Sequence, residues 1–118
     1  MTYVTGFIVP VPEGNKDEYI KVAEKFWELA KDFGALSQVE CWEKDVKDGH
    51  TTDFRRSVKA EAGEKIVFSW VTWKDEATAK AAETKMMEDP RMKEFSDMPF
   101  DGKRMVYGAF EPVFWKEA

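Results

Sequence analysis

The sequence contains one cysteine, one histidine and no long apolar run, and each shortage excludes a class of protein. Cys41 has no second cysteine with which to form a disulfide, which excludes a small secreted domain stabilised by disulfides. Residues 1–10 have no basic start followed by a long apolar stretch, as a signal peptide or a membrane span would have. We therefore expect a cytoplasmic protein without a membrane partner.

Motifs for metal, phosphate and dinucleotide binding are also missing. No cysteine–histidine cluster has metal-ligand spacing, and no glycine-rich phosphate loop or dinucleotide fingerprint occurs. The one histidine, His50, lies in a polar turn, and a catalytic histidine needs an orienting partner and a cleft. We interpret it as an exposed loop residue, with a haem ligand or a general base as the alternatives, and we expect no metal and no cofactor.

The composition is that of one globular domain. With 43% hydrophobic and 35% charged residues, the 118-residue chain can bury a single core, so we expect one domain spanning residues 1–118. The 23 acidic residues outnumber the 18 basic residues and give a net charge of -5. This charge repels phosphate backbones, so nucleic acid is not an expected partner.

Alternating apolar residues predict four strands, at residues 3–11, 35–43, 66–73 and 104–110. In the strand at residues 66–73 both faces are apolar, and we expect this strand to be buried on both sides. Cys41 lies in the middle of the second strand, and we interpret it as a buried, inert thiol.

Two helices separate these strands. Apolar residues at helical spacing predict the first at residues 16–33, capped by Asn15 together with Glu18 and ended by Gly34. Asp75 is a natural N-cap for the second helix, which is rich in alanine and ends at an Asp–Pro pair.

Residues 44–64 are polar and contain two turn signals, so we expect a long loop. Within it, residues 52–58 can form a helical turn with Phe54 and Val58 pointing inward. Loops of this length inside a compact domain are uncommon and often functional.

The predicted order is β-α-β-β-α-β, which is the ferredoxin-like α+β fold with an antiparallel sheet and two helices on one face. Two helices cover only one face of the sheet, yet three of the strands have apolar side chains on both faces. We expect a second copy of the chain to cover the other face, sheet against sheet, giving a homodimer that approaches a closed α/β barrel.

Five stretches of the sequence resemble the bacterial domain-of-unknown-function family 1428, the YbaA-like proteins. They are residues 39–42, 52–56, 67–70, 85–92 and 98–105, and the likeness covers nearly the whole chain. The resemblance implies the dimeric α/β-barrel superfamily, whose members include cofactor-independent monooxygenases and haem-degrading enzymes. It implies no particular reaction, because the family has none established.

Aromatic and basic residues are the first candidates for a ligand site. Trp42, Trp70 and Trp73 could line an aromatic pocket, although core packing is the interpretation that we favour. Asp53 is followed by Arg55 and Arg56, whose guanidinium groups could bind a carboxylate or phosphate. Alternatively, one arginine pairs within the chain and the other faces water.

The segment at residues 90–103 is the second candidate region. The candidate ligand-binding residues in and next to it are Met87, Arg91, Phe100, Asp101 and Arg104. The segment either locks the dimer or forms a lid or pocket rim.

Two hypotheses of function follow. The first is a small-molecule enzyme of the cofactor-independent oxygenase type, which predicts a pocket between the helices and the sheet near Trp42, Trp70 and Arg55. The second is a noncatalytic homodimeric binding module, because no recognisable catalytic set is present.

Overall fold

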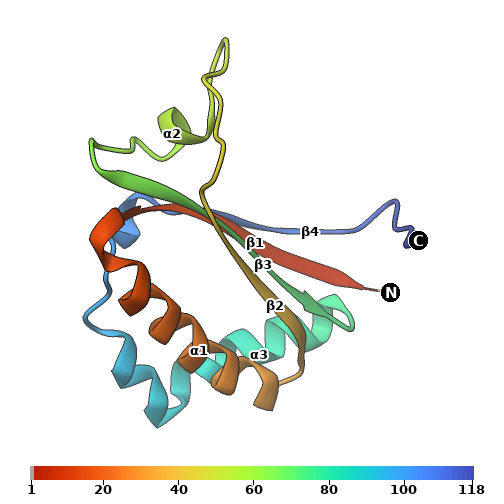
Figure 1. Cartoon of the computed structure of the whole chain (residues 1–118). Helices are drawn as coiled ribbons and strands as arrows, with labels where there is room; N and C mark the ends of the chain where they lie inside the picture. The colour runs from red at the N-terminus through yellow and green to blue at the C-terminus, as the bar shows by residue number, and fades with distance from the viewer. Residues whose placement is uncertain (1) are drawn as a thin grey trace.

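The computed structural model describes residues 2–118 and shows two layers, a four-stranded antiparallel sheet and a layer of helices on one side of it (Figure 1). The strands are β1 (Tyr3–Pro12), β2 (Ala35–Trp42), β3 (Glu64–Trp73) and β4 (Val106–Phe110), in the sheet order β2-β3-β1-β4. The two main helices are α1 (Lys16–Asp32) and α3 (Glu76–Glu88). The predicted ferredoxin-like α+β fold is therefore confirmed.

Strand boundaries differ from the predicted ones where local turns intervene. The last strand begins at Val106 instead of residue 104, because Gly102–Arg104 form a 3₁₀ turn in which the Asp101 side chain accepts a hydrogen bond from the backbone N–H of Lys103. The third strand begins two residues earlier than predicted, at Glu64.

The start of α1 is not capped as predicted. Asn15 occupies the N-cap position, but its side chain makes no capping hydrogen bond. Its Nδ2 donates instead to the carbonyl of Pro99, 2.9 Å away, because a 3₁₀ turn (Glu13–Asn15) leads into the helix. The predicted ends of both helices are close to those observed, and Asp75 caps α3 by accepting from the backbone N–H of Thr78 at 2.8 Å.

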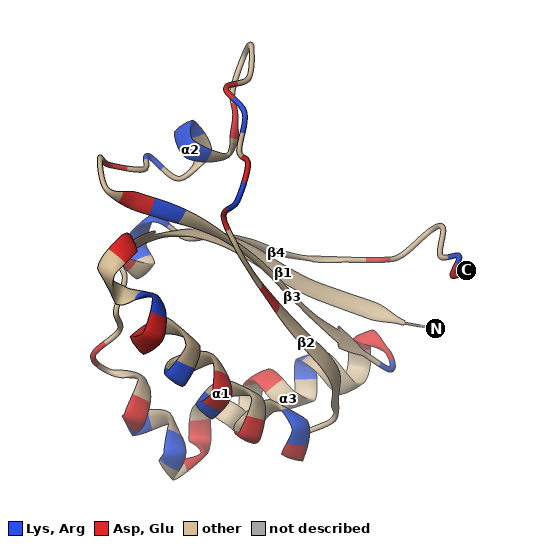
Figure 2. Ribbon diagram, viewed as in Figure 1, with Lys and Arg blue, Asp and Glu red and all other residues tan. Residues whose placement is uncertain are grey.

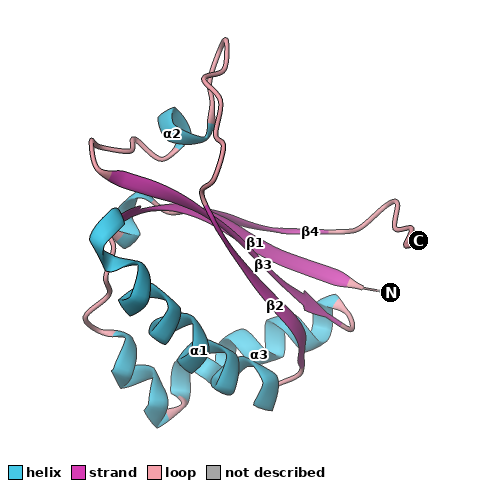
Figure 3. Ribbon diagram, in the orientation of Figure 1, coloured by secondary structure: helices cyan, strands magenta, loops and turns pink. Residues whose placement is uncertain are grey.

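The long polar segment between β2 and β3 projects on the side of the sheet opposite the helices (Figure 3). It contains the predicted helical turn, α2 (Phe54–Ser57). Val58 is buried as predicted, but Phe54 is 42% exposed, so the expectation that it points inward is wrong. Its ring packs against Phe68 with the centroids 6.0 Å apart. The rest of the segment lies over one end of the sheet (Figure 1).

The core lies between the sheet and the helices in two clusters. One gathers Leu29 and Ala30 of α1, Val71 and Trp73 of β3 and the buried face of α3, and the other gathers Val9, Val11, Tyr19 and Val67. No helix among residues 2–118 is long and apolar enough to cross a membrane.

The opposite face of the sheet, which we call the open face, has neither of the two main helices over it, and the segment with α2 covers one end of it (Figure 1). The pairing registers place on it Val4, Gly6, Ile8, Pro10, Pro12, Ser37, Val39, Cys41, Glu64, Ile66, Phe68, Trp70, Thr72, Val106, Gly108 and Phe110. Phe68 in the middle of β3 is 46% exposed, so the prediction that this strand is buried on both faces is wrong for the single chain. Cys41 is also exposed, which corrects its interpretation as a buried thiol.

Candidate functional site

A cavity of about 520 Å³ lies between the helices and the helix-facing side of the sheet. Its lining comes from all four strands, from α1 and α3, and from the segment that joins α3 to β4. Met87 and Tyr107, which are 70% and 79% exposed, belong to this lining and mark where the cavity meets solvent. The dimensions are those of a small-molecule pocket.

A cluster of four polar side chains lies on one wall of the cavity. Glu40 of β2 accepts hydrogen bonds from the hydroxyl of Tyr19 at 2.7 Å, from the hydroxyl of Ser69 at 2.8 Å and from Nε2 of Gln38 at 3.0 Å. Gln38 and Glu40 are two residues apart in one strand and so point to the same face. We call Tyr19, Gln38, Glu40 and Ser69 the polar cluster.

Burial determines the protonation of the tyrosine in this cluster. Desolvation raises the pKa of Tyr19 far above its ordinary value, and the neighbouring charge of Glu40 and the hydrogen bond to it raise the pKa further. Tyr19 therefore remains a neutral phenol that donates to Glu40, and the oxygens of Glu40 are the hydrogen-bond acceptors in the polar cluster.

The orientation of the Gln38 amide is determined by its two acceptors. Its Nε2 donates to Glu40 and also to the carbonyl of Ala23, 3.1 Å away, and a flipped amide would bring oxygen against both. The Oε1 atom is then buried without a hydrogen-bond partner among residues 2–118. Such an atom is destabilising in a purely structural role.

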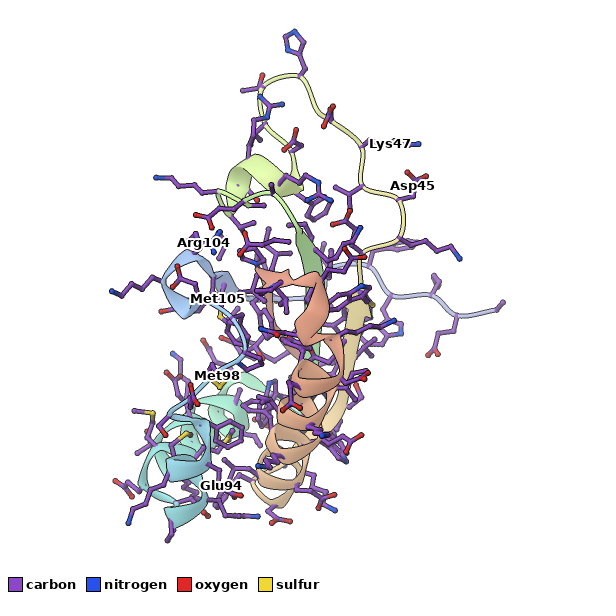
Figure 4. All side chains as sticks on the ribbon, turned by 60° about the vertical axis from the view of Figure 1, so that its left-hand side comes forward. Asp45, Lys47, Glu94, Met98, Arg104 and Met105 are labelled. Atoms are coloured by element: carbon purple, nitrogen blue, oxygen red, sulfur yellow. The ribbon has the colours of Figure 1, made fainter. Side chains whose placement is uncertain are left out.

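Apart from Thr5 and Glu83, the remaining wall of the cavity is apolar and rich in sulfur. All five methionines after Met1 line it, namely Met86, Met87, Met92, Met98 and Met105. Figure 4 shows Met98 and Met105 on the segment that joins the helical layer to the sheet. Methionine side chains are flexible and polarisable and adapt to ligands of varied shape, including aromatic rings.

Aromatic rings complete this wall. Phe100 packs on Tyr19 with ring centroids 5.7 Å apart, and Phe95 packs edge-on against Phe26 at 6.4 Å. Because Met98, Phe100 and Phe95 all come from the segment at residues 90–103, this segment forms a wall of the cavity. Its position agrees with the pocket-rim alternative.

Three of the ligand-binding candidates from the sequence, Trp73, Met87 and Phe100, line the cavity. Trp70 lies on the open face, and Trp42 packs beside the cluster around Val9 with the Lys16 ammonium 5.7 Å from its ring. The pocket predicted between helices and sheet is present, but Trp42, Trp70 and Arg55 lie outside its lining.

The candidates of the long loop pair with one another or with neighbouring backbone. Asp53 caps α2 and accepts from the Arg56 guanidinium at 3.0 Å, and hydrogen bonds from the backbone N–H groups of Arg56 and Gly49 lower the pKa of Asp53 to about 2. Arg56 also donates to the carbonyls of residues 49–51. Arg55 pairs with Glu43 and donates to the carbonyl of Glu64. Both arginines therefore pair within the chain, whereas the alternative from the sequence expected one of them to face water.

The three charged candidates near the second segment also make intrachain contacts. Arg91 bridges Asp89 and Asp32, which joins the turn after α3 to the end of α1. Arg104 makes a bidentate contact with Glu64, with both distances 2.7 Å, and a third with Asp101. Pairing with Arg104 lowers the pKa of Glu64.

The polar cluster was not predicted from the sequence, although the sequence of β2 contains a pattern that indicates it. Gln38 and Glu40 alternate with apolar residues in a strand and share the parity of Trp42, which packs toward the helices. Two polar residues on the core-facing side of a strand indicate a buried polar site.

A second hollow of about 570 Å³ lies on the open face, lined by residues that include Trp70, Gly6 and Gly108. Gly6 and Gly108 are paired across β1 and β4, and Gly6 is paired with Trp70 across β1 and β3. A bulky indole thus stands beside two residues without side chains, and the hollow is shallow and apolar.

Sequence comparison identifies relatives over almost the whole chain. A family model described as "Protein of unknown function (DUF1428)" matches residues 2–102. The uncharacterised protein YbaA of Escherichia coli K12 is 56% identical over 114 residues, covering 96% of this chain and 97% of YbaA. The YbaA protein of Shigella flexneri is identical to the same extent over the same shares.

Two solved structures share the fold at low sequence identity. A Bacillus cereus protein designated an antibiotic biosynthesis monooxygenase has a TM-score of 0.61 and 16% identity, covering 99% of this chain and 98% of that one. A NIPSNAP domain protein of Burkholderia xenovorans has a TM-score of 0.58 and 13% identity, covering 98% and 99%. At these identities the likeness extends to the fold alone.

Proposed function

The chain belongs to the DUF1428 family of proteins of unknown function, and we propose that it binds a small, largely apolar molecule in the cavity between its sheet and helices. The observation that carries this proposal is the polar cluster on one wall of a cavity otherwise lined by methionine and aromatic side chains. A ligand with an apolar body and one hydroxyl group matches both chemistries, since the body replaces water on the apolar wall and the hydroxyl donates to Glu40.

Binding is tested with 1-naphthol as the probe and with a variant that fills the cavity. Ala109 of β4 lines the cavity, so Ala109→Trp occupies ligand space, whereas Ala81→Trp introduces the same side chain on an exposed position of α3 outside the lining. We expect calorimetric titration to show binding by the parent and by Ala81→Trp, and at least ~10-fold weaker binding by Ala109→Trp, a loss of about 1.4 kcal/mol. Equal affinity in all three proteins would place the probe elsewhere.

The proposal has an enzymatic form, which the position of the Glu40 carboxylate in the cavity lining supports. A quinol whose hydroxyl proton passes to Glu40 becomes an electron-rich anion that reacts with O2. One oxygen atom enters the substrate, and the other leaves as water with two hydrogens of the substrate, so the quinol becomes a hydroxyquinone and supplies all four electrons that O2 takes up. The fold shared with the Bacillus cereus protein supports this form by analogy only.

Oxygen uptake separates the enzymatic form from a noncatalytic binding module. We expect an oxygen electrode to record uptake with a quinol substrate, and Glu40→Gln, which keeps the size of the side chain, to lower kcat by at least ~100-fold. Binding of 1-naphthol without oxygen uptake for any quinol would favour the noncatalytic module.

We further propose that the protein is a homodimer joined through the open face. Glu64 at the start of β3 is the one charged residue among the open-face residues, and it is buried and paired with Arg104, although 35% of the chain is charged. Figure 2 shows most of the charged residues on the helices and loops. The same face of a second copy is also apolar, so the two faces can exclude water from each other. In this arrangement Trp70 of one copy packs into the hollow beside Gly6 and Gly108 of the other. The single unpaired cysteine supports placement of this dimer in the cytoplasm.

Two substitutions of matched charge and exposure test the dimer. Phe68 on the open face is 46% exposed and Ile20 on α1 is 44% exposed, so aspartate at either position adds one charge to a similarly exposed site. We expect Phe68→Asp to sediment as a monomer at micromolar concentration and Ile20→Asp to remain a dimer. A parent chain that sediments as a monomer would overturn this part of the proposal.

A further inference from the structure

The C-terminal arm, residues 111–118, leaves the sheet after β4 and extends away from the rest of the chain (Figure 1). It has three large apolar side chains in a row, and Val113, Phe114 and Trp115 are 92%, 80% and 53% exposed. Exposed apolar runs of this kind indicate an interaction site.

The arm has few contacts with its own chain. The one side-chain hydrogen bond within it runs from Nε1 of Trp115 to Glu117, 3.3 Å away in the same arm. Trp115 borders the hollow on the open face, so the arm begins at the edge of the surface proposed for the dimer. The two apolar surfaces are therefore continuous.

The size of the open face explains why a dimer needs the arm. The four strands have 10, 8, 10 and 5 residues. At ~3.3 Å per residue and a strand spacing of ~4.8 Å, their flat footprint is roughly 500 Å². A stable interface buries about 800 Å² from each partner. The strands alone fall short, so apolar surface outside them has to contribute.

The chemistry of the arm favours a second copy over a lipid surface. Three apolar residues are far too few to anchor in a bilayer, and the net charge of -5 repels anionic headgroups. The hollow on the open face of another copy is largely apolar, and the one charged residue of that face, Glu64, is buried, which matches the run from Val113 to Trp115.

We propose that the two copies of the dimer exchange their C-terminal arms, with Phe114 and Trp115 of each copy packing on the other. This inference rests on the homodimer proposed above and adds a specific contact to it. Each arm holds the two sheets together at one end of the interface. Of the dimer affinity that the strands do not supply, the arms supply most.

The test combines a double substitution with a control that changes the charge equally. Phe114→Asp with Trp115→Asp adds two negative charges and removes two apolar side chains, whereas Lys116→Glu changes the charge by the same amount and keeps them. We expect sedimentation equilibrium to give a dimer Kd at least ~100-fold higher for the double variant and within ~3-fold of the parent for Lys116→Glu. Circular dichroism should show all three proteins folded, because both altered side chains are exposed in the single chain.

Cross-linking identifies where the arm lies. A photoreactive benzoylphenylalanine in place of Phe114 should join two chains covalently in a dilute dimeric sample. If the parent is a dimer but the double variant associates equally well, or the cross-links form only within one chain, arm exchange is wrong and the sheet-to-sheet dimer stands. If the parent is a monomer, both the dimer and the exchange are wrong.

Discussion

Glu64, the first residue of β3, is 7% exposed. Its buried carboxylate is stabilised by the guanidinium group of Arg104. Arg104 supplies two hydrogen bonds to it and also donates to the carbonyl of Lys59, so one side chain joins the turn before β4 to the end of the long loop. A buried carboxylate without its cation is strongly destabilising. This pair positions the loop and the cavity wall relative to each other.

Arg104→Met should lower Tm at pH 7 by about 5–10 °C, measured by calorimetry, because the Glu64 carboxylate loses its partner. The pairing lowers the pKa of folded Glu64, so its stabilisation is complete above the unfolded pKa of about 4.3 and is lost as the pH falls through the folded pKa. The difference in Tm between parent and variant should therefore shrink below pH 4.

A second substitution provides the control for this prediction. Glu64→Gln in the Arg104→Met background removes the buried charge, so the double variant should melt above Arg104→Met at pH 7. Equal Tm values for the parent and Arg104→Met would mean that the ion pair contributes nothing.

At the scale of the elements, the turn between α1 and β2 determines how the helix lies on the sheet. Gly34 ends α1 with a φ of +109°, a backbone conformation that side chains rarely tolerate. A methyl group there would lie 2.7 Å from Cγ2 of Thr78, so the turn also packs directly against α3. The close approach of α1, β2 and α3 depends on this glycine.

Gly34→Ala should destabilise the protein by about 1–2 kcal/mol from backbone strain, and by more from the contact with Thr78. Adding Thr78→Ser removes the methyl group but keeps the hydroxyl, so urea unfolding should show partial recovery. Gly14→Ala, at a position with open space around it, should unfold at nearly the parent urea concentration. A fully recovered double variant would show that steric contact, and not backbone strain, accounts for the effect.

At the scale of the whole molecule, the charges and the apolar surface are segregated. Most of the charged residues lie on the helices and loops (Figure 2), whereas the open face and the run from Val113 to Trp115 of the arm expose apolar side chains. Cys41 lies on the open face directly opposite Phe68 in the pairing of β2 with β3. The thiol therefore reports on whether this face is covered.

Cys41 should react slowly with a thiol reagent at high protein concentration and faster as the protein is diluted, because association covers the open face. In Phe68→Asp the reaction should be fast at every concentration. The rate is measured by the absorbance of the released thiolate. A rate independent of concentration in the parent would contradict coverage of Cys41.

Local patterns predicted the elements and their faces. The alternation in β1 and β3 is a short-range property, and so is the helical spacing in α1, which is why their ranges were correct within two residues. The same alternation showed that the sheet has more apolar surface than two helices can cover. The side-chain cap of α1 was wrong because Asn15 hydrogen-bonds to Pro99, 84 residues away.

The polar cluster was decided only by tertiary structure. Tyr19 comes from α1, Gln38 and Glu40 from β2 and Ser69 from β3, and the register of β2 on β3 places Glu40 directly opposite Ser69. Sequence patterns specify which face a residue occupies, because side-chain direction follows from local backbone geometry. The pairing of distant segments decides which faces meet and which hydroxyl donates to which carboxylate. A local sequence pattern does not contain that information.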